Sequence, residues 1–574
     1  MKLLFETLKP RRAYISVALT IKSLGTFVEL AIPYILSYIL DYVVESNSVG
    51  RIVLWGAVMV LCALSALVFN VIANRMAARV ARNTTREIRH SLFSRILTLS
   101  AAQVDAFTVP SLESRLTSDT YNVHGFLGMI LRMGVRAPLL LVGGLIVTAI
   151  LDPVLTLVMI VVTPVISITV YTISKKGIPL FKRSQMSSDS MVRIVREDSK
   201  GIRVIKALSK TDYERRRFDK ANRELVGCET HASNTMALSN PLVTFLLNFG
   251  LVSVITVGAF RANSDLTQPG KIIAFIQYFT LISNAMIGIT RIFVRSSKGI
   301  ASMHRISEVV LTEDDMAVDS EEKYPRMEND GYITFDDVSF AYASRTSTVS
   351  NISFSIKKGQ SLGLIGATGS GKTTLALLLM RFYDVDSGSV RIDGRDVRTI
   401  DRDELHRMFG AVMQNDFIYS GSIAENIDFG RDIPLDKIKK AAEFAQASEF
   451  IDKLSDGYDH QLTSKGTNVS GGQKQRILIS RALAGDPDIL ILDDSSSALD
   501  YKTDSALRRS IRENFANTTS IVVAQRVSSV MNCDLILVLD EGKVIGKGTH
   551  NELINSCEVY REISESQIGG AFLE

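Results

Sequence analysis

A glycine-rich segment that carries a lysine and two threonines is the part of the sequence best suited to chemistry. In chain order its residues are Gly366, Ala367, Thr368, Gly369, Ser370, Gly371, Lys372, Thr373 and Thr374. They match the pattern G-x-x-x-x-G-K-[ST] and directly follow an apolar run, residues 361–365. A strand, a glycine loop and a helix start in that order bring backbone N–H groups and the positive helix end to one anion. We predict a phosphate-binding loop in which Lys372 reaches the β- and γ-phosphates and Thr373 ligates the bridging Mg²⁺.

Two aspartates at the end of another apolar run form a second candidate group. Asp493 and Asp494 follow residues 489–492, four apolar residues in succession, downstream of the glycine loop. Such a run fits a buried strand that ends beside the phosphates. We predict that Asp493 holds Mg²⁺ through water. The two aspartates alone are a weak signal, and their place after the glycine loop strengthens it.

A second helix start has the composition of an anion-binding site. It consists of Ser470, Gly471, Gly472 and Gln473. Serine and glycine at the N-terminus of a helix leave backbone N–H groups that can face an anion. One domain rarely needs two such helix ends to bind one nucleotide.

The C-terminal part of the chain alternates short β-type runs with helical segments. The runs are residues 352–356, 361–365, 390–392, 411–413, 489–492, 521–524 and 535–539. This alternation predicts an α/β domain with a largely parallel sheet, which we place at residues 332–574. The acidic segment 312–331, which contains Pro325 and Gly331, is the predicted linker in front of it.

The N-terminal part is apolar enough to span a membrane. A chain of 574 residues is too long for one core, and 46% of its residues are hydrophobic. A net charge of +4 gives no sign of nucleic-acid binding. We predict a six-helix membrane domain over residues 1–311, whose first stretch is too long for a signal-peptide core. The six apolar stretches are residues 13–44, 52–73, 126–151, 154–173, 241–260 and 271–294.

The loops between these stretches predict an orientation. The loops at residues 75–115 and 175–223 are long and rich in arginine and lysine, whereas the other three are short and hold few. Because such charge favours the cytoplasmic side, we expect both termini and both long loops in the cytoplasm and the chain in the plasma or inner membrane. The long loops keep a helical period, so spans two to five should continue as cytoplasmic stalks. Near residues 104–110 and 201–209 we expect a turn that carries a short crosswise helix.

These motifs together resemble an ABC transporter half of the exporter type, in which six spans precede one ATPase domain. The resemblance covers nearly the whole chain, and the helix start at Ser470 is its specific marker. It implies a membrane α-helical bundle followed by an α/β P-loop ATPase domain, with ATP and Mg²⁺ as cofactors. It also implies that two ATPase domains pack head to tail, so that each nucleotide lies between one chain's glycine loop and the other chain's Ser-Gly-Gly-Gln helix. The two stalk interruptions resemble the coupling helices of this family.

The resemblance assigns roles to single residues and shows two departures. Tyr342 stands where an aromatic ring stacks on adenine, and Gln414 where a glutamine links Mg²⁺ and the attacking water to the membrane domain. Residues 497–500 match the loop that crosses to the other subunit. Asp494 replaces the usual glutamate base, and Gln525 replaces the histidine that contacts the γ-phosphate. Aspartate has about 1.5 Å less reach, and a misplaced base forfeits much of the ~10²- to 10⁴-fold that positioned proton transfer supplies.

The two departures predict a site kept for binding more than for turnover. They resemble the degenerate subunit of heterodimeric bacterial multidrug exporters, so we expect a different half-transporter as partner. The alternative is that both are tolerated variants in a working homodimer.

Polar residues within the spans are candidates for a substrate path. Glu29 lies near the middle of the first span, where a charge costs on the order of 3 kcal/mol. It would bind a cation or a proton, or else form an interhelical pair, for example with Lys22. Weaker candidates are Asn248, Gln277 and Asn284, because single amides often only bond across helices.

The predicted function is therefore ATP-driven export of amphipathic, drug-like compounds out of the cytoplasm or inner leaflet by a heterodimer in a lipid bilayer. A homodimeric lipid or peptide exporter and a nucleotide-gated channel or sensor remain alternatives. A soluble ABC ATPase that acts on nucleic acid does not fit the six spans, and we expect no nucleic-acid partner.

Overall fold

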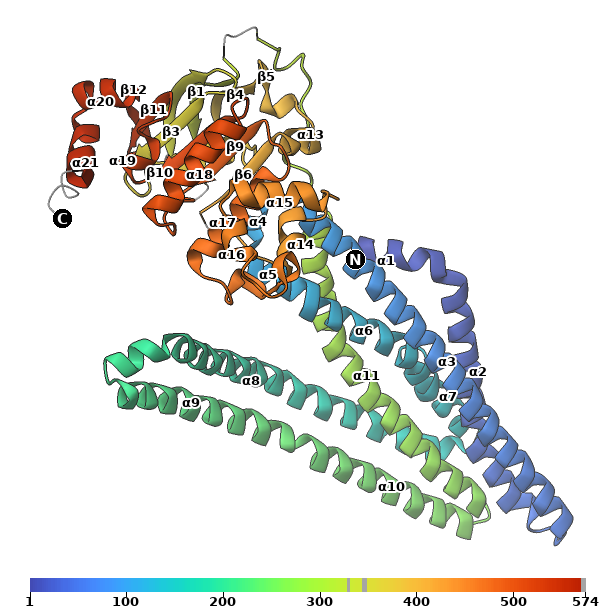
Figure 1. Cartoon of the computed structure of the whole chain (residues 1–574). Coiled ribbons are helices and arrows are strands. Elements are labelled where there is room, and N and C mark those ends of the chain that lie inside the picture. The colour runs from blue at the N-terminus through green and yellow to red at the C-terminus, as the bar shows by residue number, and fades with distance from the viewer. Residues whose placement is uncertain (328–330, 343–347, 415, 569–574) are drawn as a thin grey trace. The chain divides into compact units, whose positions relative to one another are not determined.

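The computed structural model describes residues 1–327, 331–342, 348–414 and 416–568 (Figure 1). The chain divides into two compact units. Unit 1 comprises Met1–Thr98 and Phe107–Thr312, and unit 2 comprises Leu99–Ala106 and Glu313–Glu574. The predicted linker, residues 312–331, includes residues 328–330, which lie outside the described residues, as do residues 343–347, 415 and 569–574 of the predicted second domain.

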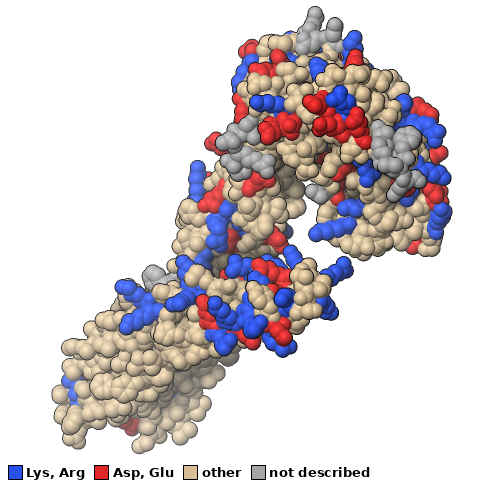
Figure 2. Space-filling view, turned by 90° about the vertical axis from the view of Figure 1, so that its left-hand side faces the viewer, with Lys and Arg blue, Asp and Glu red and all other residues tan. Residues whose placement is uncertain are grey.

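Unit 1 is helical throughout most of its length. Its long helices are α2 (Arg12–Tyr38), α3 (Val49–Thr98), α6 (Thr120–Met133), α7 (Arg136–Leu151), α8 (Pro153–Ala207), α9 (Thr211–Ala237), α10 (Ser239–Asn263) and α11 (Pro269–Val310). Within the described residues, six helical segments are long and apolar enough to cross a membrane. The prediction of six spans is confirmed. Figure 2 shows one end of this unit almost free of charged side chains, as a lipid-facing surface requires.

The four segments that were predicted to continue as stalks extend well beyond the thickness of a bilayer, which needs about 20 helical residues. The second to fifth segments contain 50, 43, 55 and 53 residues. The predicted helical continuation of spans two to five is therefore confirmed.

The two predicted stalk interruptions differ. Near the first, α4 (Ala101–Phe107) and α5 (Val109–Ser114) flank Thr108, whose φ of 63° is left-handed, so a short helix and a turn are confirmed. The second prediction is wrong in its extent, because α8 runs unbroken through Gly201 to Ala207 and only residues 208–210 turn. A glycine inside a helix costs only about 1 kcal/mol, which the helix-forming neighbours of Gly201 offset.

Unit 2 is built on a six-stranded sheet of order β12-β11-β3-β10-β9-β6. Its strands are β3 (Ser361–Gly366), β6 (Phe409–Val412), β9 (Ile489–Asp493), β10 (Thr519–Ala524), β11 (Leu535–Asp540) and β12 (Lys543–Gly548). All neighbours pair in parallel except β11 and β12. The predicted α/β domain with a largely parallel sheet is confirmed.

A second, antiparallel sheet has the order β2-β1-β4-β5. It contains β1 (Ile333–Phe340), β2 (Val349–Ile356), β4 (Ser387–Ile392) and β5 (Arg395–Asp396). Two runs that the sequence suggested for the main sheet, residues 352–356 and 390–392, belong to it. Buried side chains of both sheets, among them Phe335, Phe354 and Leu364, form one core.

This topology places four chain segments at the same edge of the main sheet. The carboxyl ends of β3, β6, β9 and β10 are followed by the glycine loop, Gln414, Asp494 and Gln525, respectively. Ligand sites of open α/β sheets form at that edge.

Candidate active site

The glycine loop joins β3 to helix α12 (Lys372–Leu379). Gly369 and Gly371 have φ angles of +86° and +99°, values that side-chain-bearing residues rarely adopt. At Gly371 a Cβ atom would also lie 2.6 Å from the side chain of Val349. Both positions therefore require glycine, and the resulting turn directs the first N–H groups of α12 toward the loop.

The Lys372 ammonium group forms hydrogen bonds with oxygen atoms of the glycine loop itself. Its Nζ donates to the carbonyl oxygens of Gly366 at 2.9 Å and Ala367 at 2.7 Å, and to Ser370 Oγ at 3.4 Å. Burial lowers the pKa of Lys372, and the nearby carboxylates of Asp493 and Asp494 oppose that shift. Bound phosphates would stabilise this cation far better than neutral carbonyl groups do.

Thr373 and Asp493 are candidate ligands for Mg²⁺. Thr373 Oγ1 donates to Asp493 Oδ2 at 2.8 Å, and Asp493 is 2% exposed. Burial raises the pKa of Asp493, whereas the Thr373 hydroxyl and Lys372 lower it. Within the part of the chain that is described, no cluster of three His, Cys, Asp or Glu side chains forms a metal site. A hydroxyl and a carboxylate are oxygen ligands, so the pair fits a Mg²⁺ ion that would complete its coordination with phosphate oxygens and water.

An aromatic cluster forms the other side of the site. The Tyr342 ring packs edge-on against Phe340 and Tyr383, with centroid distances of 4.9 and 5.2 Å. The Tyr342 hydroxyl lies 3.3 Å from Thr374 Oγ1. Phe340 and Tyr383 therefore contact the Tyr342 ring, and Thr374 contacts its hydroxyl.

Tyr383 connects this cluster to the short helix α4. Its hydroxyl donates to Asp105 Oδ2 at 2.7 Å, and burial together with this carboxylate raises the pKa of Tyr383. Helix α4 is the element that the sequence predicted as the first crosswise helix. Sequence reasoning missed Tyr383, because no local pattern connects residues 278 positions apart.

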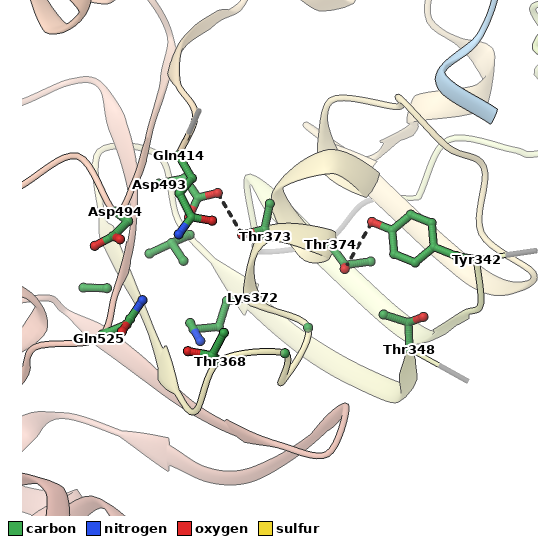
Figure 3. Close-up of a pocket in the computed structure, with 14 residues that line it drawn as sticks. Tyr342, Thr348, Thr368, Lys372, Thr373, Thr374, Gln414, Asp493, Asp494 and Gln525 are labelled. Carbon is green, nitrogen blue, oxygen red and sulfur yellow. Dashed lines mark hydrogen bonds between the residues drawn. The ribbon is translucent and has the colours of Figure 1, made fainter. Parts of the chain in front are cut away.

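Residues of the glycine loop, Asp493 and Tyr342 line one pocket of about 140 Å³ (Figure 3). Figure 3 shows Asp494 and Gln525 on one side of Lys372 and Tyr342 on the other. The structure therefore brings together most of the glycine loop, the three other predicted nucleotide and metal residues and both departures. Gly366, Ala367 and Ser370 do not line the pocket, whereas Thr348, Val523 and Ala524 do. The lining residues are Tyr342, Thr348, Thr368, Gly369, Gly371, Lys372, Thr373, Thr374, Gln414, Asp493, Asp494, Val523, Ala524 and Gln525.

Asp494 has a fixed backbone. Its φ of 50° is left-handed, its N–H donates to the Val523 carbonyl at 2.9 Å, and its own carbonyl accepts from Ser497 Oγ at 3.0 Å. Aspartate tolerates this conformation better than most residues. The carboxylate of Asp494 is therefore directed by a backbone held on both sides.

The serine-glycine helix start does not belong to this pocket. Ser470 caps helix α17 (Gly471–Leu483) in a reciprocal arrangement with Gln473 and is exposed. A Cβ atom on Gly472 would lie 3.1 Å from the Ala498 carbonyl, so the segment 497–500 packs against this helix start. The described pocket-lining residues include none of Ser470, Gly471, Gly472 and Gln473.

Comparison with known proteins identifies the family. Residues 15–286 match the family described as ABC transporter transmembrane region, and residues 349–497 match the family described as ABC transporter. Over 564 residues the chain is 35% identical to the uncharacterized ABC transporter ATP-binding protein YfiB of Bacillus subtilis, with 98% of each chain covered. The chain belongs to the ABC transporter family.

Other similarities extend over the whole ABC transporter chain. It is 29% identical over 582 residues to the putative ABC transporter ATP-binding protein exp8 of Streptococcus pneumoniae, covering 99% of this chain and 97% of the relative. The structure of a bacterial Atm1-family ABC exporter with ATP bound matches with a TM-score of 0.81 at 23% identity, covering 96% and 98% of the two chains. This last match shows that the ABC transporter has an exporter-type fold.

Membership of the family gives the site its general chemistry. The ATPase domain binds ATP, normally with Mg²⁺, and couples its hydrolysis to transport by a dimer in a lipid bilayer. The pocket at the edge of the main sheet contains most of the residues that the sequence predicted to bind that nucleotide.

Proposed function

We propose that the chain is one subunit of a heterodimeric exporter whose own nucleotide site binds Mg·ATP tightly and hydrolyses it slowly. The observation that carries the proposal is the composition of the pocket. The pocket contains most of the residues that we assign to the bound nucleotide and its metal. It also contains Asp494 and Gln525, which we assign to the attacking water and the γ-phosphate. Groups that act only in the transition state affect turnover without loosening the bound nucleotide.

Each residue has a distinct task in this proposal. Tyr342 stacks on the adenine ring, and residues 366–372 surround the phosphates. Thr373, Gln414 and Asp493 hold the metal. The bound Mg·ATP supplies a cleavable β–γ phosphate bond, and Asp494, one methylene too short, orients the attacking water poorly.

The exposed helix start at Ser470 serves the partner. Its capped N-terminus faces solvent, which suits a surface that completes a nucleotide site on another chain. The pocket volume of about 140 Å³ also supports a site open to a second chain, since complete ligand sites measure about 300–1,000 Å³.

The membrane part defines the proposed transport path. The six spans cross the plasma or inner membrane, and both termini lie in the cytoplasm. The substrates are amphipathic compounds. Glu29 Oε1 lies 2.6 Å from Arg136 Nη2. This ion pair favours the alternative that Glu29 forms an interhelical pair. Asn248 on α10 and Asn284 on α11 are exposed, and Gln277 on α11 is half-buried, so all three can face a path.

The test compares ATP hydrolysis by the purified chain with hydrolysis by the complex isolated from its native membrane. We expect the chain alone to be at least about tenfold slower, because its base is misplaced. A second half-transporter should copurify with it. Equal rates would contradict the heterodimer. ATP-dependent accumulation of an amphipathic dye in inverted vesicles separates an exporter from a nucleotide-gated channel.

A further inference from the structure

A cavity of about 380 Å³ inside unit 1 is lined mainly by cationic side chains. It is formed by residues of helices α2, α3, α6, α7 and α11, which lie far apart in the sequence. Its volume is within the range of sites for small organic ligands. The lining residues are Lys22, Asn74, Met129, Arg132, Met133, Arg136 and Arg295.

The cavity carries more positive than negative charge. Lys22 Nζ donates to Asn70 Oδ1 at 2.7 Å and Asn74 Oδ1 at 3.1 Å, both of them neutral acceptors. Arg132 Nε donates to its own helix, at the Gly128 carbonyl. Among the described contacts of these four cations, the one carboxylate is that of Glu29. Arg136 donates to this carboxylate from Nε and from one Nη nitrogen. Within the described part of the chain, Lys22, Arg132 and Arg295 therefore have no carboxylate in hydrogen-bond or ion-pair contact.

An excess of positive charge within the membrane-spanning part of a protein costs free energy. Lys22 is 4% exposed and belongs to the first membrane-crossing segment. Charged side chains in that environment each cost about 2.5–3.5 kcal/mol and pair with opposite charges or line a path. Like charges around one cavity also repel one another. An anion in the cavity would relieve both effects at once.

The walls also suit the rest of an amphipathic molecule. Met129 and Met133 contribute unbranched, polarizable side chains that adapt to ligands of different shape. Arg295 directly follows residues 271–294, the sixth apolar stretch, so this part of the cavity lies toward one end of that stretch. Cations at one end and thioethers beside them match a molecule with one anionic head and an apolar body.

We propose that this cavity binds the anionic head, a carboxylate or phosphate, of the amphipathic compound that the transporter moves. The proposal rests on the proposed function and specifies its substrate class. It also gives Glu29 the task of orienting Arg136. A cationic head would meet four positive charges and one already paired carboxylate.

The test measures equilibrium binding of three probes with the same aromatic body and different heads. Pyrenebutyrate is anionic, pyrenebutanol is neutral and pyrenebutylamine is cationic. The full-length chain is placed in phosphatidylcholine nanodiscs without nucleotide, and binding is followed by fluorescence anisotropy. No ATP is hydrolysed in this binding experiment. A negative result would therefore count against the anion site alone, because the proposed hydrolytic asymmetry is tested separately by nucleotide retention.

We expect the anionic probe to bind at least tenfold more tightly than the cationic one. Arg132→Gln and Arg295→Gln change exposed side chains and should each weaken anion binding about tenfold without unfolding the chain. Arg75→Gln is the matched control, since Arg75 is exposed on α3 next to Asn74 but does not line the cavity. Equal binding of the three probes, or equal effects of Arg132→Gln and Arg75→Gln, would overturn the proposal.

A second arm identifies the source of the anion. Phosphatidylglycerol replaces part of the phosphatidylcholine in the nanodisc. Displacement of pyrenebutyrate from the wild-type chain would assign the site to an anionic lipid head, and undiminished binding would assign it to a non-lipid amphiphile.

Discussion

Replacing Asp494 by glutamate is the sharpest perturbation of the nucleotide site. The substitution adds one methylene, about 1.5 Å of reach, at the position from which the base would contact the attacking water. A positioned general base contributes about 10²- to 10⁴-fold. Because Gln525 remains beside it, we expect only part of this gain, a rise of about tenfold to a hundredfold in hydrolysis at this chain's site.

The backbone of Asp494 predicts a second, independent effect. Its φ of 50° is a left-handed value that aspartate adopts more readily than glutamate. We expect the longer side chain to cost about 1 kcal/mol of folding free energy. For a domain of this size that lowers the midpoint of thermal unfolding by about 2–4 °C. Faster turnover and lower stability should therefore appear together.

The assay uses a photoreactive ATP analogue that carries a radioactive γ-phosphate. After binding to the assembled complex, a chase with unlabelled ATP and cross-linking, the chain is separated by size and its label is counted, which reports hydrolysis on this chain alone. Asp494→Asn is the control, because asparagine tolerates the same backbone and lacks the carboxylate. A glutamate variant whose label disappears no faster than that of the wild type would refute the assignment of Asp494 to the position of the base.

Four further substitutions test other parts of the account. Ser470→Arg should remove most ATP hydrolysis of the complex, more than about tenfold, because it puts bulk and charge where the partner's γ-phosphate docks; this chain should still retain labelled ATP, and loss of that retention would count against the proposed trans arrangement. Thr373→Val should cost about 1–3 kcal/mol of unfolding free energy by leaving Asp493 buried without its donor, and Mg²⁺ should no longer raise the unfolding temperature with ATP; unchanged Mg²⁺ dependence would exclude Thr373 as ligand. Tyr383→Phe should leave ATP affinity within about threefold but reduce stimulation of hydrolysis by transported compounds, because only the hydrogen bond to Asp105 is lost; full stimulation would show that this bond transmits nothing. Glu29→Gln should raise the affinity for pyrenebutyrate severalfold, because Arg136 loses its partner; an affinity no higher than that of the wild type would show that this pair does not restrain Arg136.

The nucleotide pocket was predictable because its residues occupy fixed places relative to strand ends. The glycine loop follows β3, Asp494 follows β9 and Gln525 follows β10, and these three strands are neighbours in the sheet. Parallel neighbours bring their carboxyl ends to one edge, so short motifs far apart in the sequence meet there. The six spans were predictable for a similar reason, since apolar length alone indicates them.

Contacts between distant helices could not be predicted in this way. Arg136 pairs with Glu29 across 107 positions and Tyr383 with Asp105 across 278, and neither pair has a local pattern. The pair that the sequence suggested, Glu29 with Lys22, is not formed, and Lys22 binds two asparagines of α3 instead. The unbroken course of α8 through Gly201 was missed because a single glycine only weakly opposes a helix.

The most direct test of the central claim is nucleotide occupancy of the two sites of the assembled complex after a single-turnover chase. The account predicts two phases, in which this chain keeps intact ATP at least about tenfold longer than its partner does. It also predicts that Lys372→Ala removes the slow phase and leaves some hydrolysis at the partner's site. Two sites that empty at one common rate would contradict the claim that Asp494 and Gln525 make this site a slow one.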